Sequence, residues 1–105
     1  MQILVNTDNT ITGHEALAEE VRSTVENKLG RFSEQVTRIE VHLGDENSHK
    51  SGGRDQRCMM EARIEGLQPT AVTAYSDTVG GAVDAAVVKL RSALDTTLGK
   101  RVERR

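Results

Sequence analysis

The residues best suited to chemistry in this chain are cations close to its C-terminal end. Lysine and arginine side chains both bind phosphate, lysine as a point charge and arginine through several N–H groups. The last third of the sequence carries six of them: Lys89, Arg91, Lys100, Arg101, Arg104 and Arg105. Between Asp77 and Arg105 these cations outnumber the four acidic residues. The pattern indicates a local site for a polyanionic partner.

The charge of the whole chain limits what kind of polyanion binder it can be. Its formal net charge is −2 over 105 residues, of which 29% are charged. A protein that coats nucleic acid without selectivity is expected to be basic overall. The segment from His14 to Glu34 has three basic and five acidic residues. A polyanion would therefore meet a patch of cations and not a uniformly positive surface.

Catalytic or metal-binding chemistry has little support in the sequence. A metal site or an acid–base pair needs several matched groups that converge. His42 and Cys58 are expected on opposite faces of a sheet, and His14 and His49 lack matched groups, so the histidines are expected at the surface. Cys58 alternates with apolar residues and is expected to be a buried, inert thiol. We predict that the protein is not an enzyme and needs no metal or cofactor.

Three further observations bear on where the protein acts. A single cysteine excludes an internal disulfide and fits a reducing compartment. No apolar run reaches the roughly 18 residues of a membrane span. The N-terminal residues lack the charged and apolar regions of a signal peptide. We expect a cytoplasmic protein without a membrane partner.

Hydrophobic periodicity predicts the elements that must position these side chains. Alternating apolar residues predict strands over residues 2–6, 36–44, 57–65 and 70–76. A helix is expected to begin after a capping box of Thr12 and Glu15 and to end at Gly30, with positive φ. Apolar residues three or four apart predict a second helix over 77–98, followed by a mobile basic tail over 99–105. The two apolar stripes are Leu17, Val21, Val25 and Leu29, then Val79, Val83, Val87, Leu90, Leu94 and Leu98.

The element order β-α-β-β-β-α predicts one domain over residues 1–98. Its fold class is α+β, a two-layer sandwich with two helices on the apolar face of a four-stranded sheet. The other face of the sheet would carry Arg38, Arg57 and Arg63. These arginines could bind RNA, but Glu40, Glu61 and Glu65 share the face. Pairing across strands is the favoured interpretation.

The ordered set of elements resembles the bacterial ribosome hibernation-promoting factors, the family of the ribosome-associated inhibitor called protein Y. The resemblance covers about residues 1–98. It is carried by Gln2-Ile3 with Val5, by Val25 to Leu29 before Gly30-Arg31-Phe32, and by the pattern from Ala82-Val83-Asp84 through Lys89-Leu90 to Leu94. It implies the β-α-β-β-β-α fold, similar in outline to double-stranded RNA-binding domains.

The resemblance also implies a function. Members of this family bind the small ribosomal subunit, its 16S rRNA and its proteins, in the channel for mRNA and tRNA. They stop translation under stress by occlusion while the ribosome is stored, without covalent chemistry. On this basis the rRNA-binding residues are expected among the cations of the two helices and the segment that follows: Lys28, Arg31, Lys89, Arg91, Lys100 and Arg101.

The chain departs from the family pattern at several positions. Ser92 and Thr96 stand where relatives often carry lysine or arginine, and Gly80 stands where an aromatic residue is usual. Fewer cations imply weaker or more salt-sensitive binding, or a shifted contact surface. The chain resembles the short form of the family, so the second domain by which long relatives pair ribosomes is not expected.

Two other classes of function remain open at this point. The acidic outer side of the first helix would repel RNA, and it favours a regulatory module that binds another protein through this helix or the open sheet face. A small enzyme is the weakest reading, because no nucleophile, base and oxyanion donor can be assembled.

Overall fold

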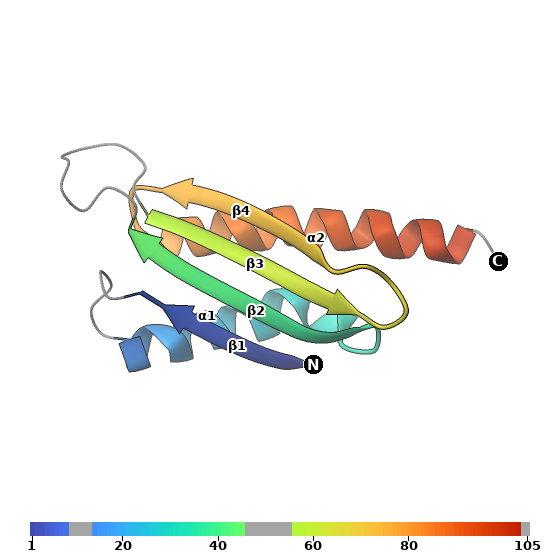
Figure 1. Cartoon of the computed structure of the whole chain (residues 1–105), viewed down its shortest axis with the longest axis horizontal. Coiled ribbons are helices and arrows are strands. Elements are labelled where there is room, and N and C mark those ends of the chain that lie inside the picture. The colour runs from blue at the N-terminus through green and yellow to red at the C-terminus, as the bar shows by residue number, and fades with distance from the viewer. Residues whose placement is uncertain (9–13, 46–55, 104–105) are drawn as a thin grey trace.

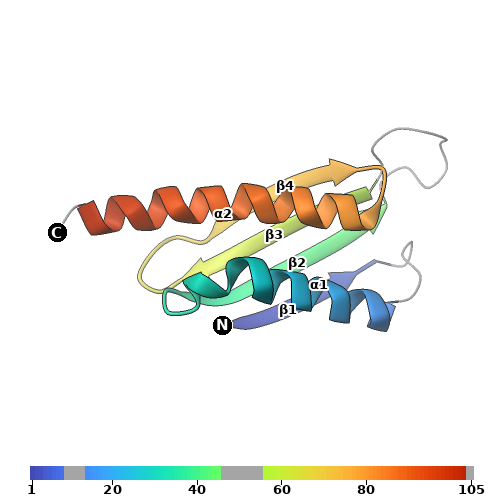
Figure 2. The same cartoon turned by 180° about the vertical axis from the view of Figure 1, so that it is seen from behind.

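The computed structural model describes residues 1–8, 14–45 and 56–103, which form a four-stranded sheet and two α-helices (Figure 1). The strands lie in the order β1 (Gln2–Thr7), β2 (Val36–Asp45), β3 (Gln56–Ile64) and β4 (Thr70–Ser76). β1 pairs with β2 in parallel, and β2, β3 and β4 form an antiparallel meander. The helices α1 (His14–Leu29) and α2 (Val79–Glu103) cover one face of this sheet (Figure 2). The predicted α+β sandwich is confirmed.

The core lies between that sheet face and the helices. Strand alternation turns Ile39, Val41 and Leu43 of β2 inward, where each is at most 3% exposed. Both helical stripes meet them, because residues three or four apart share one side of a helix. The helical core residues are Val21, Val25, Leu29, Ala82, Val83, Ala86, Val87, Leu90 and Leu94, with Leu17, Val79 and Leu98 partly buried. Burial of aliphatic surface therefore fixes the position of both helices.

The start of α2 differs from the predicted start at Asp77. Thr78 precedes the helix, and its hydroxyl accepts a hydrogen bond from the Gly81 amide at 3.0 Å, so Thr78 is the N-cap. A β-carbon at position 81 would collide with the hydroxyl oxygen of Ser76. Gly81 thus allows the end of β4 to approach the first turn of the helix.

The predicted role of Gly30 is wrong. Gly30 does not take positive φ after α1 but opens a short 3₁₀ helix, η1 (Gly30–Phe32). The burial of Phe32, which is 5% exposed, holds the chain in this extra turn. Among the described glycines, positive φ occurs at Gly66 (78°), in the turn between β3 and β4.

The end of α2 was also predicted too early. The helix continues through Gly99 to Glu103, five residues beyond the predicted end at Leu98. A glycine weakens a helix by about 1 kcal/mol but does not have to end it. Most of the expected tail therefore has a helical backbone. The capping residue Thr12, the segment 46–55 with His49, and Arg104 and Arg105 lie outside the described residues.

The position of Leu90 generates a test of this packing. Leu90 is fully buried in the core, whereas Val88, on the same helix, is 57% exposed. We expect Leu90→Ala to lower the free energy of unfolding by about 2–5 kcal/mol, and Val88→Ala to change it by less than about 0.5 kcal/mol. Urea denaturation followed by circular dichroism measures both. Equal losses would show that α2 is not packed as described.

Candidate nucleic-acid interface

Arg31 is the predicted cation with the most defined surroundings. It lies in η1, where its Nη2 atom donates to both carboxylate oxygens of Asp95 on α2, at 2.8 and 2.9 Å. Its guanidinium carbon lies 4.3 Å from the centre of the Phe32 ring, a cation–π arrangement. Both partners of the ion pair remain about half exposed, at 58% for Arg31 and 51% for Asp95. The pair ties the end of the first helical segment to α2.

Lys28 and Arg91 each lie about one helical turn before a partner of this ion pair. Lys28 is exposed in the last turn of α1, three residues before Arg31. Arg91 is exposed on α2, four residues before Asp95, and so lies one turn away on the same side of the helix. Neither side chain has an ion-pair or hydrogen-bond partner in the part of the chain that the structure describes. Both are available to an anionic ligand.

Lys89 is bound to the sheet instead. Its Nζ atom donates to the main-chain carbonyl of Thr73 in the edge strand β4, at 2.8 Å. An ammonium group has three donors, so two remain for a ligand. Lys89 also lines a shallow groove of about 600 Å³ along α2, with Val88, Ser92, Ala93, Thr96 and Thr97. The expected departures Ser92 and Thr96 both line this groove, and Lys89 is the cation among its lining residues.

Lys100 and Arg101 lie in the last turns of α2. This part of the helix extends beyond the end of the sheet (Figures 1 and 2). Both residues have a helical backbone. The helices α1 and α2 run in the same direction over the sheet (Figure 2). Their C-terminal ends, with Lys28 in one and Lys100 and Arg101 in the other, therefore point the same way. Cations at such ends also complement the helix dipole.

The acidic residues of α1 have the expected placement. Glu15, Glu19, Glu20 and Glu26 are all exposed, and Glu19 pairs with Arg22 at 3.0 Å. The predicted cations therefore do not form one continuous patch. They lie around the meeting of η1 with α2, along the groove of α2 and at the end of α2.

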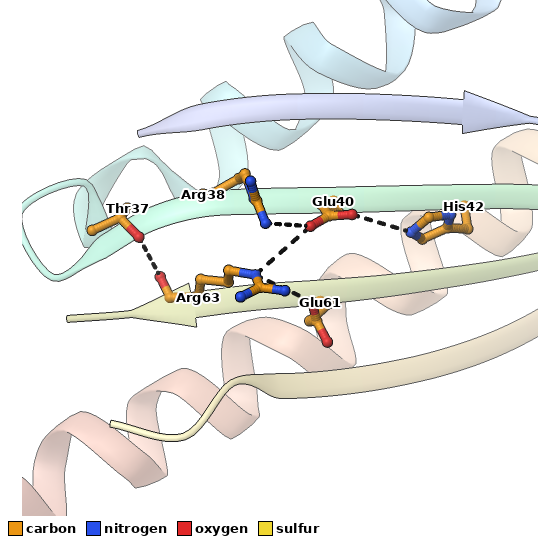
Figure 3. Close-up of polar contacts among 6 residues, drawn as sticks. All are labelled: Thr37, Arg38, Glu40, His42, Glu61 and Arg63. Atoms are coloured by element: carbon orange, nitrogen blue, oxygen red, sulfur yellow. Dashed lines mark hydrogen bonds and ion pairs between the residues drawn. The ribbon is translucent and has the colours of Figure 1, made fainter. Parts of the chain in front are cut away.

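The open face of the sheet carries a charge cluster, shown in Figure 3. Arg38 faces Arg63 across β2 and β3, and Glu40 faces Glu61, so like charges are direct neighbours. Opposite charges meet on the diagonals and along each strand: Arg38 to Glu40 at 2.8 Å, Arg63 to Glu40 at 3.7 Å and Arg63 to Glu61 at 3.6 Å. The favoured pairing across strands is confirmed for Arg63, which contacts Glu40 on β2, whereas Arg38 pairs with Glu40 along its own strand.

The same face shows a local irregularity. The register between β2 and β3 shifts between Val36 and Arg38, and the Thr37 hydroxyl donates to the Arg63 carbonyl at 3.2 Å (Figure 3). His42 lies beside the charge cluster, with its Nε2 atom 3.6 Å from Glu40. The charged side chains of this face thus contact one another, although the Nε atom of Arg38 is buried without a hydrogen-bond partner among the described residues.

The candidate nucleophile and metal ligands do not converge. Cys58 is fully buried, and burial raises the pKa of its thiol from an ordinary 9.0 to about 12, although the charge of Arg57 opposes this shift. His42 lies on the other face of the sheet, as predicted. Over residues 1–8, 14–45 and 56–103, no three His, Cys, Asp or Glu side chains gather as a metal site requires.

Sequence reasoning missed two contacts of this interface. The sequence marks Asp95 only as one of the acidic residues of the last third, although it binds Arg31 from 64 positions away. The Thr73 carbonyl that binds Lys89 has no signature in the sequence, because every residue has such a group. A helical projection could have placed Asp95 beside Arg91, but nothing in the spacing pointed to Arg31.

Comparisons with known proteins agree with this fold. The N-terminal domain of Thermus thermophilus protein Y matches with a TM-score of 0.71 and 16% identity, covering 92% of this chain and 99% of that domain. A ribosomal subunit interface protein from Coxiella burnetii matches with a TM-score of 0.70 and 17% identity, covering 94% and 99%. Among curated proteins, the search found no match.

The family is established by the sequence itself. The model of the family described as "Sigma 54 modulation protein / S30EA ribosomal protein" matches residues 5–102. The chain therefore belongs to this family. Membership confirms the resemblance drawn from the sequence and makes this a ribosome-associated protein, not an enzyme. None of the helices in the described part of the chain has the length and apolarity of a membrane span.

The burial of Cys58 predicts low reactivity and a pH effect of known sign. Because the thiolate is the reactive form, the folded protein should react with a thiol reagent far more slowly than the unfolded chain near pH 8. Above pH 9 the unfolded state loses a proton that the folded state keeps up to about pH 12. Stability should therefore fall over this range, by at most about 1.4 kcal/mol per pH unit.

Cys58→Ala is the control, because it lacks this titration. Denaturation at about pH 8 and about pH 10 should show a larger loss for the parent than for the variant. Fast labelling of the folded parent, or an equal loss in both proteins, would contradict the buried position.

The charge cluster gives a second prediction. Glu40 is 20% exposed and contacts two arginines, so Glu40→Gln should lower the free energy of unfolding by about 1–2 kcal/mol. Glu61 is 30% exposed and lies 3.6 Å from Arg63, so Glu61→Gln should lower the free energy of unfolding by about 0.5 kcal/mol or less. Thermal unfolding of both variants at low and high salt measures this difference, which salt should reduce. A Glu61 variant less stable than the Glu40 variant would disprove the central role of Glu40.

Proposed function

We propose that this protein binds the small ribosomal subunit through the cations of its helical side and blocks the channel for mRNA and tRNA. The observation that carries the proposal is the exposed pair Lys28 and Arg91 beside Arg31, on a chain of the S30EA family. The protein Y and subunit interface protein named above share the fold, which supports an interface role on the ribosome. Such a protein acts in the cytoplasm.

The charge distribution favours the helical side, and not the sheet face, as the surface that binds RNA. On the sheet, Arg38 and Arg63 are already paired with carboxylates. On the helical side, Lys28 and Arg91 can neutralise phosphates without first losing a partner. Contacts to phosphate fix position and orientation and require no base sequence. The acidic residues Glu15, Glu19 and Glu20 lie in the N-terminal half of α1, away along the helix from Lys28 in its last turn.

Inhibition in this proposal is steric. The sheet and helices share one aliphatic core, so the domain can occupy a channel as a single body. Its occupation of the path of mRNA and tRNA excludes both ligands. Blocking the channel in this way needs no nucleophile, consistent with the buried thiol of Cys58.

Binding to purified 30S subunits over a salt series tests the proposal. We expect the parent protein to co-sediment at low salt and to dissociate as salt rises. The variant Lys28→Gln with Arg91→Gln removes two phosphate contacts. It should bind more weakly at low salt, and the slope of log K against log salt should become shallower by about 1.4–1.8.

The matched control is Arg38→Gln with Arg63→Gln, which removes the same charge from paired positions on the open face of the sheet. It should bind almost as well as the parent. No binding of the parent at any salt concentration would overturn the function, and equal weakening of both double variants would overturn the site.

A further inference from the structure

We propose that Asp95 is an internal competitor for the phosphate-binding group of Arg31, and that an RNA backbone phosphate replaces its carboxylate on binding. This inference rests on the proposed function and adds a residue that sets its affinity. Asp95 belongs to none of the predicted binding residues, and its negative charge would by itself argue against a role at an RNA interface.

In the ion pair, the oxygens of Asp95 occupy the position beside Arg31 that the oxygens of a bound phosphate would take. The Nη2 atom of Arg31 lies 2.8 and 2.9 Å from the two oxygens of Asp95. Phosphate oxygens take the same distances in charge-assisted hydrogen bonds to arginine. Both oxygens of Asp95 accept from one nitrogen of the guanidinium group, and the carboxylate charge repels a phosphate that approaches the remaining N–H donors.

Arg31 has a second contact, besides Asp95, that holds its guanidinium group. Its guanidinium lies over the ring of Phe32, with 4.3 Å between the carbon and the ring centre. Phe32 is itself anchored in the core, at 5% exposed. The ring therefore keeps the cation in place when the carboxylate leaves, so the freed group is preorganised for a phosphate.

The carboxylate can leave at low cost. Both side chains are about half exposed, so water and ions reach the pair. Exposed ion pairs of this kind shift an equilibrium by only about 1.4- to fivefold. Asp95 would thus weaken RNA binding by a small factor without preventing it. In the free protein it would also lower the positive potential around Arg31 and Arg91, which discourages binding to unrelated polyanions.

The test compares two substitutions that change charge equally. Asp95→Asn releases Arg31, whereas Asp84→Asn removes an exposed carboxylate on the same helix, about 16 Å away along its axis. We expect Asp95→Asn to bind 30S subunits about two- to fivefold more tightly than Asp84→Asn at the same salt concentration. In an Arg31→Gln background this advantage should disappear. Equal affinities of the two single variants, or an advantage that survives without Arg31, would overturn the inference.

A second measurement keeps the inference independent of ribosome binding. Inorganic phosphate is titrated into each protein while the Nε–H signal of Arg31 is followed by NMR. The signal should respond at lower phosphate concentration in Asp95→Asn than in the parent or in Asp84→Asn. A failure of every variant to bind 30S subunits would reject the proposed function, while unchanged phosphate responses would reject the competition by Asp95.

Discussion

The structure depends on the burial of one aliphatic sheet face beneath two helices. The chain has only two aromatic residues, so the contact relies on side chains such as Ile39, Met60 and Leu90, all fully buried. Aliphatic burial is not directional, but close packing makes the positions of the helices definite. Everything proposed for the surface follows from this layer, because it aligns α1 with α2 and brings η1 to Asp95.

A chain with net charge −2 can still bind a polyanion if its charges are sorted by position. On the sheet face, Arg38 and Arg63 pair with Glu40, so their positive charge is largely neutralised there. The helical side leaves Lys28 and Arg91 unpaired within the described residues and holds Arg31 with a removable carboxylate. Local arrangement, and not total charge, therefore decides which surface attracts phosphate.

The sequence was sufficient for the features that depend on periodicity. Alternation placed Ile39, Val41 and Leu43 inward and Arg38 and Glu40 outward, because strand geometry permits no other arrangement. The spacing of Val83, Val87, Leu90 and Leu94 gave the buried side of α2 for the same kind of reason. Family resemblance then indicated the ribosome as partner.

The features that escaped prediction depend on contacts distant in sequence. Gly30 and Gly99 both suggested helix ends, but the burial of Phe32 and the continuation of α2 to Glu103 override local propensity. The partners of Arg31 and Lys89 come from other elements and were visible only in three dimensions. Ion pairs between exposed side chains have no periodic signature, so the details of the interface required coordinates.

A structure of the protein bound to the 30S subunit would test the central claim most directly. The account predicts that the side formed by α1, η1 and α2 faces 16S rRNA, with Lys28, Arg31 and Arg91 within hydrogen-bond distance of backbone phosphates and Asp95 turned away from Arg31. A complex in which the face around Glu40 contacts the RNA while these cations face solvent would contradict it.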